Sequence, residues 1–508
     1  MAPSHVHLPD GQSFTIQPVF GGLFFKSNEL NTHPAPFPVG WSITLQTGCD
    51  GHHQPASDDQ ENHEPRLRRF TSPTLKNDSI FISSISLPSS SDFKPHPSPS
   101  RQIALMLWIS LYWYFQQPEP DPYVKSPPNA QIPHEAMPKG EWRIHIKRDG
   151  IFRTKNMIPK LERMGLITST DTSAGTGLSE KEQGWVHMSV SRSAFWQLHS
   201  GLFLFTLQPL RSQSLFSASP ISSRPASPVR SDSSYKPTSV FSADLPGGPI
   251  PTTLASQPSF PVGPYYSSSH LPTFYPPPPL QYAMTKNIRH PRRQKPPRMG
   301  ETFYARFIPS VGKYLSFRVA SLSPDPVPHL GPVSKLETTG EDHHAHLCSM
   351  SDDSLLREWL SKSRVSAFWG THHPGFLPTA MNSQHSFPAI GLWDGVPFGY
   401  FEIYWVKEDL LGQTMGNDAQ DFDRGMHVLV GEEWARGRVA TWLSSLVHYC
   451  LQADNRTMNV YLEPRVDNER FIKHLQVAGF AKERQISFHH KQAWLCHLRR
   501  DVWDGPTF

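Results

Sequence analysis

Cysteine is scarce in this sequence and lacks the spacing of a disulfide framework. The 508 residues contain 4 cysteines, and no two of them form a CxxC pair: Cys49, Cys348, Cys450 and Cys496. Small secreted folds depend on several disulfides, and structural zinc sites depend on closely paired cysteines. The scarcity argues against both classes and predicts a reduced, intracellular protein.

Long apolar runs and a strong charge imbalance are also missing. The longest apolar run, residues 103–115, is too short to span a bilayer and predicts a buried helix. The start of the chain has no secretory pattern, and its last three residues are not a Ser-Lys-Leu peroxisomal address. The net charge of +4 gives no argument for a nucleic acid or a membrane partner. We expect a cytoplasmic protein, with the peroxisome as the alternative.

Proline, in contrast, is abundant, and its distribution divides the chain. The 51 prolines, about twice average usage, concentrate with serine in two stretches. Residues 46–101 are predicted to be a disordered insertion, and residues 208–299 a Ser/Pro-rich linker that ends in a basic run at 289–295. We interpret that run as solvated linker; a nuclear signal or an anionic contact is the alternative. The ordered parts are then residues 1–45 with 102–207, and residues 300–508.

The first ordered part has the pattern of a small α/β domain. Asp10-Gly11 predicts a hairpin turn, residues 142–147 alternate like a half-buried strand, and residues 156–166 have helical spacing. Two further strands are expected within 185–207, the second at 202–205. A winged helix that reads DNA is an alternative. Because the basic residues are few, we favour a structural or dimerising domain and predict no nucleic-acid partner. The additional domain is compatible with a homodimer.

The second ordered part is organised as strand, turn, helix, strand, helix over residues 396–479. In the strand 396–405, Glu402 and Tyr404 share one face while Trp405 lies on the other. A charged Glu402 on a half-buried strand either faces solvent or meets a cationic substrate. This layout is that of an acyl-CoA-dependent N-acyltransferase.

A loop that opens a helix after a strand is suited to a pyrophosphate, because the free N–H groups of the first turn point outward. Acetyltransferases of the GNAT superfamily use Arg/Gln-x-x-Gly-x-Gly/Ala here, and this chain resembles that motif only at Gly437. A plain helix start is the alternative. The residues that we expect to contact the cofactor on this strand, loop and helix are Leu429, Val430, Trp434, Arg436, Gly437, Arg438, Val439 and, from the next helix, Asn468.

His427 lies on the strand that leads into this loop, where a histidine can take the proton of an attacking amine. The alternative is an ordinary strand histidine. Asp467 follows the next strand, and its carboxylate is predicted to orient the imidazole across the cleft. Alternatively, Asp467 or Asn468 caps the helix that follows.

The close cluster His343, His344, His346 and Cys348 contains ligand types for a metal. These residues are too near each other in sequence for four of them to surround one ion easily. We predict no metal site.

Three segments together resemble the acyltransferases of siderophore biosynthesis. They are the run from Asp394 to Trp405, Gly425-x-His427, and Glu463-Pro464-x-x-x-Asn468. The family includes the bacterial aerobactin and mycobactin hydroxylysine acyltransferases and the fungal N5-hydroxyornithine acyltransferases, and the fungal group is also resembled at residues 6–11 and 18–27. Bacterial members have an aspartate directly after Glu-Pro, where this chain has Arg465.

The resemblance implies a GNAT fold, an acyl-CoA co-substrate and a hydroxamate product. It further implies that the N-terminal part is a second, degenerate acyltransferase-like domain, and that His385 and Lys491 contact the substrate beside Glu402 and Trp405. We predict acyl transfer to N5-hydroxyornithine, with acetyl as the group. The alternatives are anhydromevaloyl transfer to the same acceptor, and a protein or polyamine N-acetyltransferase.

Overall fold

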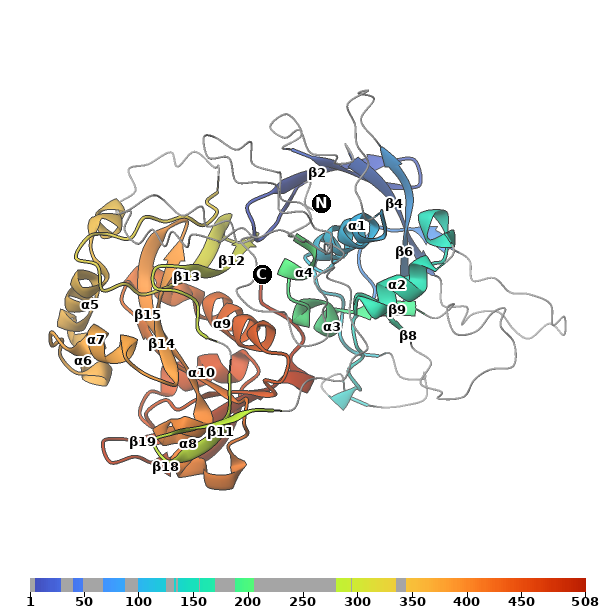
Figure 1. The fold of residues 1–508 in the computed structure, drawn as a ribbon. Coiled ribbons are helices and arrows are strands. Elements are labelled where there is room, and N and C mark those ends of the chain that lie inside the picture. Colours follow the sequence, from blue (N-terminus) through green and yellow to red (C-terminus); the bar gives the residue numbers. More distant parts are fainter. Residues whose placement is uncertain are drawn as a thin grey trace, which may run out of the picture.

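Two large sheets, one in each half of the chain, dominate the computed structural model. The structure describes residues 5–28, 40–48, 67–86, 99–124, 132–133, 136–154, 156–169, 188–204, 280–293, 295–334 and 344–508. In Figure 1 the two sheets lie on either side of helix α9, and the C-terminus lies between the halves.

The C-terminal sheet runs β12-β13-β14-β15-β16-β17-β19-β18, and all neighbours are antiparallel except β16 and β17. Helices α5 to α7 cover the face away from the N-terminal half, while α9 covers the face toward it (Figure 1). Its strands are β12 Thr302–Ile308, β13 Lys313–Val319, β14 Ser386–Trp393, β15 Val396–Trp405, β16 Arg424–Val430, β17 Asn459–Leu462, β18 Ala481–Ser487 and β19 Gln492–Arg499. Its α-helices are α5 Asp352–Ser361, α6 Ser363–Trp369, α7 Phe376–Met381, α8 Leu410–Met415, α9 Val439–Ala453 and α10 Glu469–Val477.

The amino-acid pattern explains the elements that shape the site. In β15 the ring of Phe401 is buried while Glu402 on the opposite face is half-buried, as the alternation predicts. Helix α9 carries buried side chains almost all round, because it lies between the sheet and the other half of the molecule. It begins at Val439, after a short 3₁₀ turn, η7 Glu433–Arg438.

The N-terminal sheet runs β1-β2-β3-β4-β6-β7-β9-β8, with the short β5 paired to β4. Its strands are β1 His5–His7, β2 Ser13–Val19, β3 Gly22–Ser27, β4 Gly40–Gly48, β5 Leu67–Arg69, β6 Asp78–Ser86, β7 Arg143–Ile146, β8 Thr168–Ser169 and β9 Met188–Ser191. Its helices are α1 Pro99–Tyr114, η2 Gly150–Arg153, α2 Met157–Arg163, α3 Arg192–Gln197 and α4 Gly201–Leu204.

The N-terminal sheet repeats the topology of the C-terminal one. In each, four antiparallel strands lead to a fifth, a long helix follows, and the next strand returns parallel to the fifth. In each, the last strand of the sequence then inserts between its two predecessors. The expected α/β class holds for both halves, and the shared strand order matches the predicted acyltransferase-like character of the N-terminal part.

Three expectations need correction. Residues 67–86, predicted to be part of a disordered insertion at 46–101, contain β5 and the buried strand β6, whose apolar side chains are separated by polar ones that masked the pattern. Residues 201–204 form α4 instead of a strand. The end of the predicted linker forms a hairpin, β10 Tyr282–Thr285 with β11 Ile288–Pro291, and Arg293 of the basic run is buried against Glu408 instead of being solvated.

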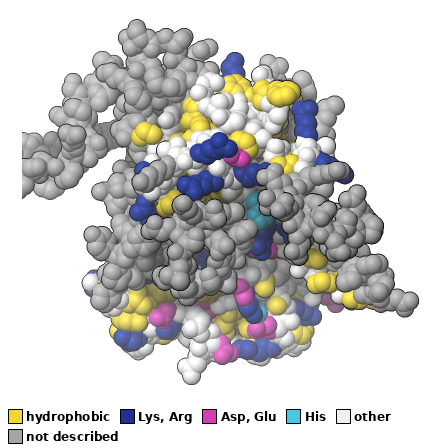
Figure 2. Space-filling view, turned by 90° about the vertical axis from the view of Figure 1, so that its right-hand side faces the viewer, with side chains coloured by type: hydrophobic (Ala, Val, Ile, Leu, Met, Phe, Trp, Pro, Cys, Tyr) yellow, Lys and Arg dark blue, Asp and Glu magenta, His cyan; other side chains and the backbone are white. Residues whose placement is uncertain are grey.

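The two halves share one core. Helix α9 packs against α3, where Nε2 of His448 lies 2.7 Å from the carbonyl oxygen of Trp196. Residues near the C-terminus fill the seam, by which we mean the interface between the two halves. There Trp503 stacks on His448, and Phe508 contacts Trp196. Figure 2 shows a face at 90° to the view of Figure 1, where Lys and Arg side chains of the described residues are scattered among apolar ones. The homodimer stays a prediction.

Candidate active site

A cleft opens where the two parallel strands of the C-terminal sheet separate. Strands β16 and β17 pair only at Arg424 with Val460 and at Gly425 with Tyr461, and diverge beyond. The cleft has a volume of about 460 Å³. The residues that line it come from α6, β16, η7, α9, β17, α10 and the segments after β17 and β18: Arg364, Val365, Phe368, Trp369, Met426, His427, Val428, Leu429, Val430, Arg436, Val439, Trp442, Leu462, Glu463, Pro464, Arg465, Asn468, Arg470, Phe471, His474, His490 and Lys491.

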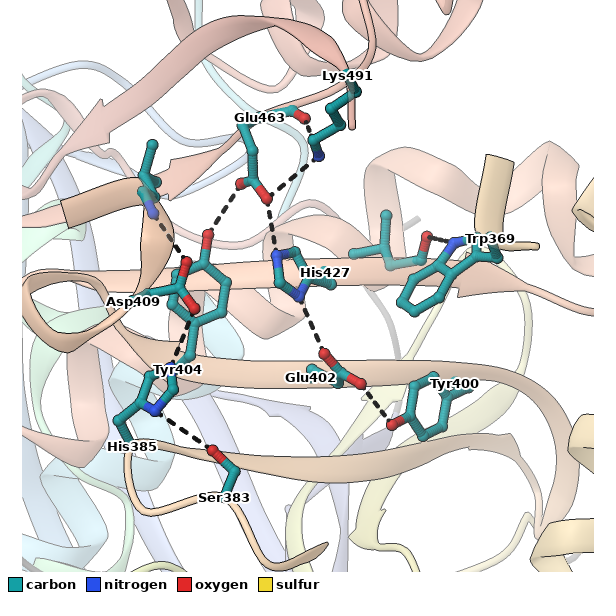
Figure 3. Close-up of polar contacts among 12 residues, drawn as sticks. Trp369, Ser383, His385, Tyr400, Glu402, Tyr404, Asp409, His427, Glu463 and Lys491 are labelled. Carbon is teal, nitrogen blue, oxygen red and sulfur yellow. Dashed lines mark hydrogen bonds and ion pairs between the residues drawn. The ribbon is translucent and has the colours of Figure 1, made fainter. Parts of the chain in front are cut away.

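His427 lies between two carboxylates at one end of this cleft. Its Nδ1 is 3.0 Å from Oε2 of Glu402, the residue paired with it on β15, and its Nε2 is 2.7 Å from Oε1 of Glu463 (Figure 3). Parallel pairing explains the second contact, because His427 lies three residues beyond Arg424 and Glu463 three residues beyond Val460. The imidazole is 31% exposed, while the Glu463 side chain is only 4% exposed. The ring therefore faces the cleft and is held from both sides.

These contacts set the protonation of the group. Burial alone would lower the pKa of His427, but the charges and hydrogen bonds of Glu463 and Glu402 outweigh it and raise that pKa well above its usual range. Burial alone would raise the pKa of Glu463, but His427 and Lys491 hold it at about 2. The group is therefore an imidazolium between two carboxylates at neutral pH, and it titrates as a coupled unit.

Further side chains fix the two carboxylates. The hydroxyl of Tyr404 donates to Oε2 of Glu463 at 2.9 Å, and the hydroxyl of Tyr400 donates to Oε1 of Glu402 at 2.7 Å (Figure 3). Nζ of Lys491 donates to the backbone oxygen of Glu463 at 2.9 Å. Because each carboxylate has a second partner, the imidazole is held in one orientation.

Three arginines gather along the cleft beyond His427, each from a different element. Arg364 of α6 donates to the carbonyl oxygen of Val430 at 3.0 Å, and Arg436 of η7 and Arg470 of α10 line the same cleft. Burial and then the charges of Arg364 and Arg470 lower the pKa of Arg436. Among the residues that the structure describes, none of the three forms an ion pair with a carboxylate. This uncompensated positive charge is suited to a phosphate-bearing ligand.

Helix α6 lies over the cleft and touches both diverging strands. Nε1 of Trp369 donates to the carbonyl oxygen of Val428 on β16 at 3.2 Å (Figure 3), and Nη1 of Arg465, after β17, donates to the carbonyl oxygen of Ala367 at 2.8 Å. The helix therefore forms one wall of the cleft next to His427.

The cleft brings together seven of the residues singled out from the sequence. They are His427, Leu429, Val430, Arg436, Val439, Asn468 and Lys491. Glu402 reaches the cleft through His427. The side chain of Asn468 makes no capping bond to α10, which leaves its amide for the cleft.

Other predicted residues lie elsewhere. Asp467, expected to orient His427, instead pairs with Arg465 at 2.6 Å and is largely exposed, because it lies beyond the end of β17. His385 bonds to Asp409 at 3.0 Å and does not line the cleft (Figure 3). The ring of Trp405 stacks on Arg424 on the opposite face of β15 from Glu402.

The loop residues Trp434, Gly437 and Arg438 do not line the cleft either. The 3₁₀ turn η7 carries the ring of Trp434 toward His344 and Phe398, and the guanidinium of Arg438 lies 5.0 Å from the ring of Trp393. Of the residues at this loop, Arg436 is the one whose side chain faces the cleft.

Sequence reasoning assigned no role to Glu463, Arg364, Trp369 or Arg470. Glu463 could have been found, because counting residues along two parallel strands places it level with His427. No sequence pattern indicated the other three residues, since helices α6 and α10 reach the cleft only through the tertiary fold. Within the described ranges no group of three His, Cys, Asp or Glu is placed to hold a metal ion, and no helix is long and apolar enough to cross a membrane.

The splayed parallel strands, the helix between them and the cleft define an acyltransferase of the GNAT class, and residues 349–488 match the family model of the acetyltransferase (GNAT) domain. The chain is 52% identical to the N5-hydroxyornithine acetylase sidL of Beauveria bassiana (strain ARSEF 2860), over 97% of this chain and all of that protein. It therefore belongs to the family of that acetylase, whose GNAT members use acyl-CoA as co-substrate.

Two more distant relatives match mainly one part of the chain. The N(6)-hydroxylysine O-acetyltransferase of Escherichia coli is 35% identical over 39% of this chain and 56% of its own length. The N(5)-hydroxyornithine:cis-anhydromevalonyl coenzyme A-N(5)-transacylase of Beauveria bassiana (strain ARSEF 2860) is 34% identical over 42% of each chain.

Proposed function

We propose that this enzyme transfers an acetyl group from acetyl-CoA to the hydroxylamine nitrogen of N5-hydroxyornithine and forms a hydroxamate for siderophore biosynthesis. The observation that carries the proposal is the cleft in which His427 contacts Glu402 and Glu463, in a chain 52% identical along its whole length to an N5-hydroxyornithine acetylase.

The cleft residues fit an acyl-CoA. Arg364, Arg436 and Arg470 provide charge for its phosphates, and the half-buried apolar side chains of Val428 and Phe471 line the same cleft. Bound there, the co-substrate supplies the acyl group as a thioester. Beyond Gly425, β16 is not paired with β17, and its carbonyl oxygens at Val428 and Val430 accept from Trp369 and Arg364 instead.

A hydroxylamine is a fitting nucleophile for this site. Its nitrogen is much less basic than that of an alkylamine and is unprotonated near neutral pH, so the enzyme need not remove a proton before the attack. Holding the nucleophile beside the carbonyl carbon supplies most of the rate enhancement in such a reaction. Trp369 and α6 form the wall of the cleft beside which the nucleophile would be held.

The proton leaves after the attack. As the new N–C bond forms, the C–S bond of the thioester breaks and CoA leaves as a thiolate. The attacking nitrogen carries a positive charge and gives up its proton readily, so a carboxylate held beside an imidazolium can accept it. In this site Glu402 holds Nδ1 of His427, and the pair of Nε2 and Glu463 faces the cleft. We assign the proton to the carboxylate of Glu463, because the imidazolium of His427 has no free nitrogen lone pair. Tyr404 and Lys491 keep Glu463 in place.

One relative supports a different acyl-CoA donor. The cis-anhydromevalonyl coenzyme A transacylase shares 34% identity over 42% of this chain, so a longer acyl group on the same acceptor is the closest alternative. A protein or polyamine N-acetyltransferase is less favoured, because the acidic groups in the cleft are already paired with His427 and Lys491.

The test is incubation of the purified protein with N5-hydroxyornithine or ornithine and a panel of acyl-CoAs, with mass spectrometry of the products. We expect acetyl-N5-hydroxyornithine, a positive ferric hydroxamate colour, and little product from ornithine. Faster reaction with ornithine than with N5-hydroxyornithine would contradict the proposal, and preference for a longer acyl-CoA would replace acetyl as the donor.

A further inference from the structure

A second charged pair lies at the mouth of the cleft, close to His427. Nε and Nη2 of Arg465 donate to the two carboxylate oxygens of Asp467 at 2.6 and 2.8 Å. Arg465 lines the cleft two residues beyond Glu463 and is held in an extended conformation by its bridge to Ala493. The pair therefore sits on the same segment that carries one carboxylate of the site.

The guanidinium of Arg465 is oriented independently of Asp467. Its Nη1 donates to the carbonyl oxygen of Ala367 at 2.8 Å, and its central carbon lies 4.4 Å from the ring centroid of Phe368. These contacts fix the plane of the guanidinium group, which presents two parallel N–H donors to a carboxylate. Asp467 fills that position, but its side chain is 58% exposed. An exposed ion pair contributes little to stability and is easily exchanged for another.

Other cations near His427 have partners that are harder to displace. Lys491 is bonded to the buried Glu463, and Arg364 to backbone carbonyl oxygens of β16. Among the cleft-lining cations in the described part of the chain, Arg465 is thus the one that forms an ion pair with a solvent-exposed carboxylate.

We propose that Arg465 and Asp467 bind the head group of the amino-acid acceptor, with Arg465 receiving its α-carboxylate and Asp467 its α-ammonium. This inference rests on the proposed function and deepens it, since it identifies the acceptor as a free α-amino acid. On binding, the internal ion pair is replaced by two ion pairs to the zwitterion, so no charge is left unpaired.

The dimensions agree with this assignment. An extended chain advances about 3.3 Å per residue, which places the Cα of Arg465 about 7 Å from that of Glu463. From the Cα of ornithine to its side-chain nitrogen there are four bonds of about 1.5 Å, an extended span of about 5 Å. A head group at Arg465 therefore leaves the hydroxylamine within reach of the Glu463 and His427 contact.

The experiment compares three acceptors with a fixed saturating acyl-CoA. N5-hydroxyornithine has both head-group charges, its α-carboxamide lacks the carboxylate, and N-butylhydroxylamine lacks both. The variants are Arg465→Met, which keeps an apolar stem over Phe368, and Asp467→Asn. Arg484→Met is the matched control, because Arg484 makes an exposed ion pair with Asp418 outside the cleft lining.

We expect Arg465→Met to raise KM for N5-hydroxyornithine by roughly 10- to 100-fold, the loss of a hydrogen-bonded charge pair. Its kcat/KM for the carboxamide and for N-butylhydroxylamine should stay within about threefold of the unmodified enzyme. Asp467→Asn should raise KM for both substrates that carry the ammonium and leave N-butylhydroxylamine unaffected. Arg484→Met should change none of these values.

Two results would overturn the head-group assignment while the proposed function stands. One is an unmodified enzyme that uses N5-hydroxyornithine and its carboxamide equally well. The other is an Arg465→Met variant that loses the same factor with all three acceptors, which would show that Arg465 only holds α6 through Ala367. An unmodified enzyme that acylates no hydroxylamine would overturn the proposed function and this inference together.

Discussion

The two halves of this chain have the same strand order but differ at the positions that make the site. The first parallel pair is Arg424 with Val460 in one half and Ser79 with His145 in the other. Counting on from these pairs, the place of His427 is taken by Ile82, and that of Glu463 by Arg148. The residue paired with Ile82 across the antiparallel ladder is Ile43, where the C-terminal half has Glu402.

The two halves also differ in what occupies the gap between the parallel strands. After β7 the chain turns at once into η2, which packs on β6 and buries Phe152 completely. Gly150 has a φ of +54°, and a Cβ there would lie 2.2 Å from the carbonyl oxygen of Ile82, so only glycine allows this approach. After β17 the chain instead runs on extended to Arg465 and leaves the cleft open. The same topology serves as packing in one half and as an active site in the other.

The largest difference in activity between matched variants of the two halves is expected when the imidazole of His427 is removed. His427→Ala should lower turnover by roughly 10²-fold or more, because Glu463 loses the imidazolium that orients it for proton transfer. Ile82→Val, at the equivalent position, should leave turnover unchanged. Steady-state kinetics with N5-hydroxyornithine and acetyl-CoA measure both. Equal activity of His427→Ala and the unmodified enzyme would show that the halves do not differ in the way proposed.

Removing the charge of the buried carboxylate is the next largest change. Glu463→Gln should lower turnover by about 10- to 100-fold, since it weakens the proton-accepting pair but keeps its shape. The control is Glu469→Gln, an exposed glutamate in the first turn of α10. A fully active Glu463→Gln enzyme would assign the proton to another group.

The arginines should affect the co-substrate more than the chemistry. Arg436→Ala and Arg470→Ala should each raise KM for the acyl-CoA by about tenfold and leave kcat nearly unchanged, because their contacts to phosphates are the same before and during the reaction. Titration at two salt concentrations checks the electrostatic origin. If kcat falls while KM stays constant, the arginines do not bind phosphate.

A smaller effect concerns stability and pH. The raised pKa of His427 means that its interactions stabilise the fold fully below about pH 6.5, its unfolded value, and that this contribution is lost as pH rises through the folded pKa. The difference in unfolding free energy between the unmodified protein and His427→Gln should therefore be larger at pH 6 than at pH 10. Ile82→Val should lower the unfolding free energy by about 1 kcal/mol at both pH values. Urea unfolding followed by tryptophan fluorescence measures this, and a pH-independent cost for His427→Gln would contradict the assigned ion pairs.

Much of the C-terminal half could be predicted because its strands and helices have strong periodicity. The alternation of 396–405 predicted β15, and the strand, turn and helix order of 396–479 predicted the fold and the strand that carries His427. The partner of His427 was placed wrongly at Asp467, because the two parallel strands were not aligned residue by residue, a count that places Glu463 level with His427. Residues that approach from other elements, such as Arg364 and Trp369, cannot be predicted without the packing of α6 on β16. In the N-terminal half, serine and proline around β6 hid a central strand.

The seam between the halves has a consequence for biosynthesis on the ribosome. The backbone oxygen of Thr507 accepts from Arg306 at 2.8 Å, and its N–H donates to Ser444 at 2.8 Å, so the joint depends on residues translated after every strand. The N-terminal half, made first, then waits with the ring of Trp196 uncovered until those residues leave the exit tunnel. During this interval the uncovered ring adds exposed hydrophobic surface, which makes a nascent chain more prone to aggregate.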